Sequence, residues 1–183
     1  MLAPNPIFPF DKPDVYSVLE EEPTYNAAIH LDLEKPTNIE LMDEFGYSQE
    51  EIDASPSPMA VAGPFRILSN EGVAAAKVVL DQLRDTAESD EGNRAPNYLA
   101  GGVYKSRFLR DLCACPVLIQ HMSEIAGTSL AAHSIPHQQL YVNFAPEDIS
   151  KAVDSWHIDS IDYDCVILLE DPKSFEGGHF QYF

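Results

Sequence analysis

The residues best suited to chemistry in this sequence are His157 and Asp159, two positions apart in "SWHIDSIDYDC". Alternate side chains of a β-strand share one face, so a strand here would place the two about 6 to 7 Å apart on the same side. An imidazole and a carboxylate so placed are the near half of the two-His, one-carboxylate arrangement that holds Fe(II) and leaves positions open. His-x-Asp pairs also occur often on surfaces that bind no metal, so the surrounding sequence must decide between the two.

Alternating apolar and polar residues predict strands on both sides of the pair, in "HQQLYVNFAP", "WHIDS" and "YDCVILLED". In the first of these, Leu140, Val142 and Phe144 share an apolar face, and Tyr141 and Asn143 share the opposite, polar face. The turn "PKSFEGG" and a last strand "HFQYF" follow.

Helices are predicted before the strands. In "LSNEGVAAAKVVLDQLRDTAE" apolar residues recur every three or four positions, and Ser69 or Asn70 can cap the first turn. "SRFLRDLCAC" predicts a short helix, and Pro116 and Gly127 are placed to begin and end another. Helices first and strands afterwards predict an α+β fold with a mainly antiparallel sheet or barrel.

The chain divides by composition into two parts. Residues 1–64 are rich in proline and acidic residues, which break regular structure, and we expect them to pack on the body as loops and short helices. Residues 65–183 carry the predicted helices and strands.

Charge and cysteine content narrow the function classes. The net charge of -19 repels phosphate backbones and anionic lipids, which argues against nucleic-acid and membrane-surface binding. No apolar run of membrane-spanning length and no secretory signal is present, and three cysteines do not form a disulfide framework. We therefore expect free thiols in a cytoplasmic protein.

The region from about residue 138 onward resembles the Fe(II)/2-oxoglutarate-dependent oxygenase superfamily, in its prolyl-hydroxylase and phytanoyl-type branches. The resemblance rests on His157-x-Asp159, the apolar stretch after it, and the "FEGGHFQYF" that follows. It implies a fold in which N-terminal loops and helices precede the first strands of a double-stranded β-helix (a jelly roll of cupin-like type).

The resemblance also implies roles for individual residues. His157 and Asp159 match the first two iron ligands of the superfamily. Tyr141, Asn143 and Gln181 lie where members often place groups that touch 2-oxoglutarate or substrate, although each is equally well explained as an ordinary strand residue. The implied cofactors are Fe(II) and the cosubstrate 2-oxoglutarate, with O2 and a small molecule as the other reactants.

Two groups that the family requires are missing from the sequence. The family uses a second His on a late strand and, beyond it, an Arg or Lys that pairs with 2-oxoglutarate. After Asp159 the only His is His179 and the only basic residue is Lys173. We therefore expect a β-helix that is incomplete in this chain, completed by a C-terminal segment or by a second chain.

The sequence thus favours a hydroxylase of a small molecule. This chain would provide the early half of its active site, and we expect the chain alone to be inactive. Two alternatives stay open. One is a catalytically inactive, cupin-like binding module, and the other is a cupin-type metal enzyme that uses His179 as its third ligand.

Overall fold

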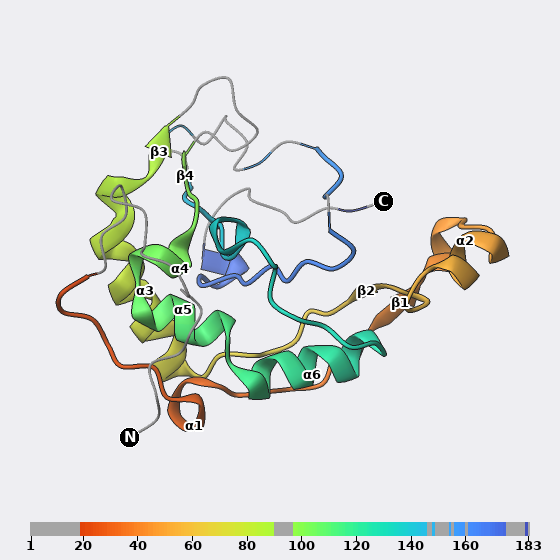
Figure 1. Cartoon of the computed structure of the whole chain (residues 1–183), viewed down its shortest axis with the longest axis horizontal. Coiled ribbons are helices and arrows are strands. Elements are labelled where there is room, and N and C mark those ends of the chain that lie inside the picture. Colours follow the sequence, from red (N-terminus) through yellow and green to blue (C-terminus); the bar gives the residue numbers. More distant parts are fainter. Residues whose placement is uncertain are drawn as a thin grey trace.

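The computed structural model describes residues 19–89, 97–145, 148, 154, 156–159, 161–174 and 182. Helices make up most of its regular structure, and two small antiparallel sheets lie beside them, so the α+β prediction is confirmed (Figure 1). The helices are α1 (Ala27–His30), α2 (Gln49–Ala54), α3 (Asn70–Leu83), α4 (Gly102–Lys105), α5 (Arg107–Cys113) and α6 (Pro116–Ala126), with 3-10 turns η1 (Met42–Phe45), η2 (Arg84–Thr86), η3 (Pro136–Gln138) and η4 (Pro172–Ser174). The strands are β1 (Ile39–Leu41), β2 (Met59–Ala62), β3 (Glu88–Ser89), β4 (Asn97–Leu99) and β5 (Val142–Asn143).

The predicted starts of α3 and α6 and the predicted end of α6 are confirmed. Ser69 caps α3, because its Oγ accepts a hydrogen bond from the Gly72 N–H at 3.0 Å. Pro116 opens α6, and Gly127 ends it in the left-handed conformation with φ 70°. None of the helices within the described residues has the length and apolar character needed to cross a bilayer.

The core lies between α3, α5 and the strand β4. Its first cluster of buried apolar residues comprises Ala75, Ala76, Val79, Leu80, Leu83, Leu99, Phe108, Leu109 and Phe144. A second cluster comprises Ile67, Leu68, Leu112, Cys115 and Leu118. Helix α5 contributes to both clusters, so it is the element that joins the two halves of the core.

The strand predicted for "HQQLYVNFAP" is shorter than expected. Residues 136–138 form η3, and Leu140 has a positive φ of 57°, which interrupts an extended backbone. Only Val142 and Asn143 pair in the sheet, opposite Leu99 and Tyr98 of β4. The predicted faces are nevertheless confirmed, because Leu140, Val142 and Phe144 pack in or against the first core cluster.

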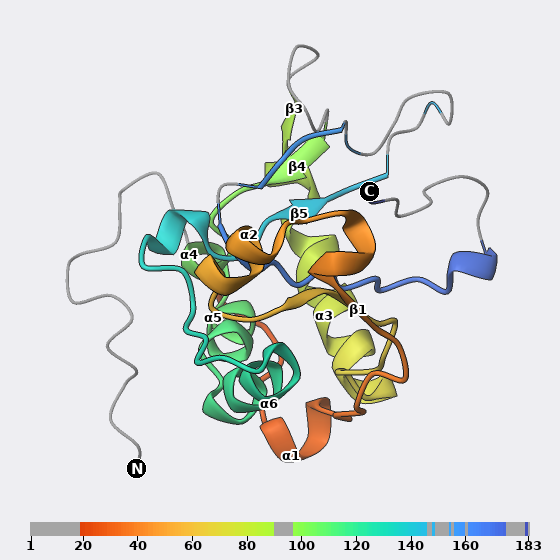
Figure 2. The ribbon, with the colours of Figure 1, turned by 90° about the vertical axis from the view of Figure 1, so that its right-hand side faces the viewer.

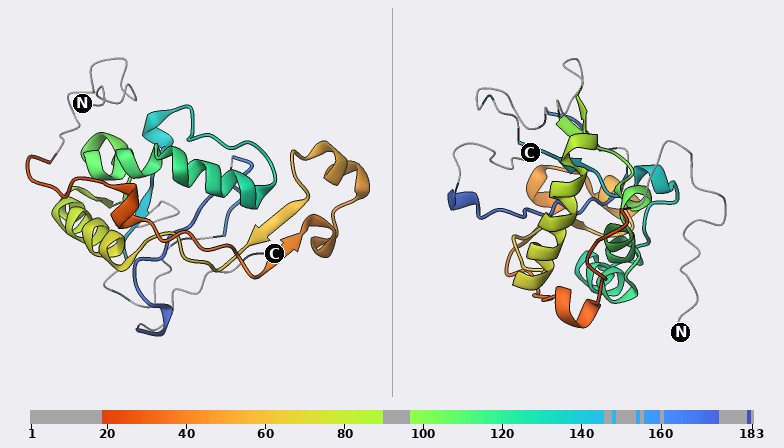
Figure 3. Two further views of the ribbon diagram at one scale, coloured as in Figure 1. Left: turned by 90° about the horizontal axis from the view of Figure 1, so that it is seen from below. Right: turned by 90° about the vertical axis from the view of Figure 1, so that its left-hand side faces the viewer.

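The sheet with the order β3-β4-β5 lies at one end of α3 (Figure 2). All of its pairings are antiparallel, and β5 lies on the side of β4 away from β3. In the other sheet, β1 pairs with β2, and the connection between these two strands contains η1 and α2. This region forms an arm that projects from the body beside the end of α6 (Figures 1 and 3).

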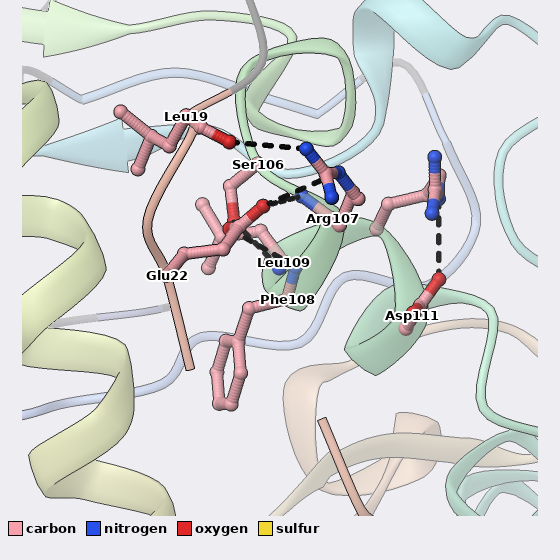
Figure 4. A network of polar contacts seen from close by, with 8 residues as sticks. Leu19, Glu22, Ser106, Arg107, Phe108, Leu109 and Asp111 are labelled. Atoms are coloured by element: carbon pink, nitrogen blue, oxygen red, sulfur yellow. Dashed lines mark hydrogen bonds and ion pairs between the residues drawn. The ribbon is translucent and has the colours of Figure 1, made fainter. Parts of the chain in front are cut away.

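Residues 19–34 pack on the body and do not extend away from it. His30 is buried, and Leu31 forms an isolated antiparallel bridge with Leu68. The carboxylate of Glu22, only 5% exposed, accepts hydrogen bonds from the Arg107 N–H at 2.9 Å and the Ser106 hydroxyl at 2.5 Å (Figure 4). The first N–H groups of a helix have no acceptor within the helix itself, and Glu22 supplies one at the N-terminus of α5.

Replacing Glu22 with alanine is expected to lower the free energy of unfolding by about 1–3 kcal/mol, because buried donors at the start of α5 lose their acceptor. The measurement is urea unfolding followed by far-UV circular dichroism. Glu21→Ala is the matched control, since Glu21 is an exposed carboxylate one residue away and should change stability by less than about 0.5 kcal/mol. Equal effects for the two variants would contradict the capping role.

Candidate functional site

The predicted pair comes together in the structure. The Nε2 atom of His157 lies 3.2 Å from the Oδ1 atom of Asp159. The strand predicted for "WHIDS" is wrong for residues 156–159, which form no ladder. All four residues are exposed, Trp156 and Ile158 by 63% and 96%, so the pair lies at the surface.

The separation of the pair suits a shared metal ion. Two ligand atoms at about 2.1 Å from one ion and at right angles to each other are about 3 Å apart. The measured 3.2 Å between Nε2 and Oδ1 is close to that value. The same distance suits a hydrogen bond from an Nε2–H of the imidazole to the carboxylate, so the two side chains can also contact each other directly when no ion is bound.

The opposite side of the imidazole faces a second carboxylate. The Nδ1 atom of His157 lies 3.8 Å from Oδ1 of Asp154, and the Asp154 side chain is 24% exposed. Oδ2 of Asp154 accepts a hydrogen bond from the side-chain amide of Asn143 at 3.1 Å. A continuous series of polar contacts therefore runs from strand β5 through Asn143, Asp154 and His157 to Asp159.

The three acidic and imidazole side chains do not converge on one point. Asp154 and Asp159 approach different nitrogen atoms of the same ring, so an ion on Nε2 would be out of reach of Asp154. Within the described part of the chain, no group of three or more His, Cys, Asp or Glu side chains could hold a single ion. The described residues thus provide two donors for a metal and an outer partner for one of them.

Of the three residues predicted to contact 2-oxoglutarate or substrate, one lies near the His157–Asp159 pair, one makes other contacts and one is outside the described residues. Asn143 contacts Asp154, as described above, and so lies one step away from the His157–Asp159 pair. The Tyr141 hydroxyl donates to Gln138 Oε1 at 3.4 Å, and its ring stacks on Tyr98 with 6.4 Å between centroids. Gln181, like His179 and the Gly177–Gly178 turn, lies outside the described residues.

The apolar stretch after the pair forms no strand. Residues 163–169 of the predicted strand "YDCVILLED" have no ladder, so that prediction is wrong within the described residues. Leu169 packs against both core clusters, and Glu170 forms an ion pair with Lys77 of α3 at 2.7 Å. Val166 and Leu168 face outward and are 55% and 53% exposed. Cys165 and Ile167 are exposed as well, so the contact of this stretch with the core is made at Leu169.

Burial disfavours the thiolate form of the two cysteines near this segment, Cys113 and Cys165. Burial raises the pKa of the Cys113 thiol to about 12, and the nearby Cys165 contributes to that rise. Burial also raises the pKa of the Cys165 thiol to about 11, although the residue as a whole is exposed. Thiols with such pKa values hold little thiolate at neutral pH, so a packing role fits both.

Asp154 was not among the predicted site residues. The available signal was its spacing of three residues to His157, but Asp154 lies between two predicted strands, where no side-chain direction could be assigned. The contact from Asn143 gives Asp154 its place, and that contact joins residues 11 positions apart.

Comparison of the chain with protein-family models, with curated proteins and with solved structures finds no match. The case for a function therefore depends on the residues themselves and on their geometry.

Proposed function

We propose that this chain provides the early half of the active site of an Fe(II)/2-oxoglutarate-dependent oxygenase, a hydroxylase of a small molecule. The observation that carries the proposal is the 3.2 Å approach of His157 Nε2 to Asp159 Oδ1, which suits two neighbouring ligands of one ion. The motif resemblance of residues 157–178 adds the reaction class.

In this proposal the two side chains have distinct roles. His157 offers a neutral nitrogen donor, and the Asp159 carboxylate supplies negative charge that offsets the charge of Fe(II). When bound, the iron would couple the oxidative decarboxylation of 2-oxoglutarate, which yields succinate and CO2, to insertion of the second oxygen atom of O2 into a C–H bond. The net charge of -19 favours a neutral or cationic substrate over an anionic one.

The proposal includes a completing segment or second chain, because a second His and a basic residue for the distal carboxylate of 2-oxoglutarate are still needed. In the completed protein, residues 156–159 and 161–169, which form no ladder in this chain, would become strands of a double-stranded β-helix once neighbouring strands are supplied. The exposed apolar side chains of Val166, Ile167 and Leu168 support this assignment, since a β-helix covers such side chains with a neighbouring layer.

Metal titration tests the proposal, with fluorescence as the readout. Trp156 is the only tryptophan of the chain and is adjacent to His157, so a paramagnetic ion held there should quench its emission. We expect anaerobic Fe(II) to quench the wild-type chain, and His157→Ala and Asp159→Ala to weaken binding by at least the 10–100-fold known for loss of a ligand's supporting partner.

Two matched controls accompany these variants. His133→Ala removes a histidine that contacts main-chain atoms of Ile135, and Asp162→Asn removes a nearby exposed carboxylate. Both should bind Fe(II) like the wild type. Quenching that survives His157→Ala and Asp159→Ala would refute the metal site.

Adding 2-oxoglutarate to the Fe(II)-loaded chain tests its completeness. We expect no visible charge-transfer band of the chelate from this chain alone. A band would contradict the requirement for a completing segment. The nucleotide sequence after codon 183 offers a further check, since it should encode a His closely followed by an Arg or Lys if the segment is on the same gene.

A further inference from the structure

We infer that Asp154 is a positioning residue for His157, and that Asn143 holds Asp154 in place for this task. The inference depends on the proposed function, in which Nε2 of His157 faces the metal. The contact of Asp154 with Nδ1 would set the orientation of the His157 ring.

The first support is the geometry of the imidazole. Asp154 lies on the Nδ1 side at 3.8 Å, and Asp159 lies on the Nε2 side at 3.2 Å. A metal-binding His almost always donates its other ring N–H to a carboxylate, a carbonyl or a water, and this contact fixes both tautomer and ring direction. The 3.8 Å separation exceeds a hydrogen bond, but such contacts often shorten only when the site is loaded.

The second support is the anchoring of Asp154 to a fixed element. The Asn143 amide donates to Oδ2 of Asp154 at 3.1 Å, which leaves Oδ1 to face His157. Asn143 belongs to β5 and pairs with Tyr98 of β4 in the antiparallel ladder. The next residue, Phe144, is buried in the first core cluster and donates its N–H to the Asn97 carbonyl at 2.9 Å. The side chain that donates to Asp154 is therefore anchored in the sheet, next to a core residue.

The third support is the separation of roles between the two carboxylates. Asp154 cannot share an ion with Nε2, because it faces the other nitrogen. With a metal on Nε2, the ring proton would lie on Nδ1, where the Asp154 carboxylate is placed to accept it. Asp154 would thus act on metal affinity without touching the metal.

Co(II) titration of the full chain, followed by Trp156 fluorescence, tests the inference. We expect Asp154→Ala to weaken Co(II) binding by about 10–100-fold. Asp154→Asn should recover part of the loss, because its amide oxygen can still accept from Nδ1–H. Asn143→Ala should weaken binding less than Asp154→Ala, since it only loosens the carboxylate.

Asp162→Ala is the matched control, because it removes the same charge from an exposed position nearby. A second readout is the NMR signal of the His157 Nδ1 proton in the chain loaded with diamagnetic Zn(II). The signal should be protected from exchange in the wild type and lost in Asp154→Ala, which a purely structural role of Asp154 would not require.

The outcomes separate the inference from the proposed function. If the wild type binds Co(II) through His157 and Asp159 but Asp154→Ala behaves like Asp162→Ala, the inference is overturned and the metal site stands. If the wild type binds no Co(II) at this pair, the proposed function fails, and the positioning role fails with it.

Discussion

Replacing Phe108 with alanine should lower the free energy of unfolding by about 3–5 kcal/mol, the range for removing a buried aromatic side chain. Phe108 is 1% exposed and belongs to α5, which joins the two core clusters. Its ring also contacts the rings of Tyr25 and His30, with centroid distances of 5.6 and 5.2 Å. The substitution should therefore loosen residues 25–30 as well as the helix.

Urea unfolding followed by far-UV circular dichroism measures this effect. Trp156 is a poor probe of the core, because it is 63% exposed and lies at the candidate site. Val78→Ala in α3 serves as the control, since Val78 is half exposed and alanine has the higher helix propensity, so its effect should lie within about 0.5 kcal/mol. A loss below about 1 kcal/mol for Phe108→Ala would contradict the described core.

Replacing Gly72 with alanine should destabilise the protein by about 3 kcal/mol, the upper end of the usual cost of overpacking. In an exposed helix this exchange stabilises by about 1 kcal/mol, because alanine is the better helix former. Here a Cβ atom would overlap the His30 carbonyl oxygen and lie 3.0 Å from the carbonyl carbon. Both atoms belong to the main chain of α1, so they cannot move aside as a side chain could.

Ala74→Gly is the matched comparison for Gly72→Ala. Ala74 is exposed on the same helix, so this reverse exchange should cost only the propensity difference of about 1 kcal/mol. The two opposite exchanges are thus both expected to destabilise α3. A stabilised Gly72→Ala variant would show that α1 does not pack against α3 in solution.

The helices were predictable because their signals are local. Ser69, Pro116 and Gly127 act within one turn of their own positions, and the apolar repeat of α3 needs no knowledge of its partners. The strand predictions were wrong for residues 156–159 and 163–169, because a strand requires a partner at ladder distance and alternation alone does not provide one.

In the candidate site, too, local contacts were predictable and contacts between distant residues were not. His157 and Asp159 are two positions apart, so their contact is local and needs no ladder. Asp154 could not be assigned, since its contact with His157 depends on a hydrogen bond from β5. Likewise, nothing in the sequence indicated that Gly72 lies against the His30 carbonyl.

By itself, the sequence determined the α3, α5 and α6 helices, the inward face of Leu140, Val142 and Phe144, and the pairing of His157 with Asp159. These features could be predicted because the sequence patterns that indicate them span only a few residues. Only the tertiary structure decided how Asp154 and Asn143 join the pair and how the N-terminal residues enter the core. Those contacts link distant positions, and their energies appear only when packing brings the two partners together.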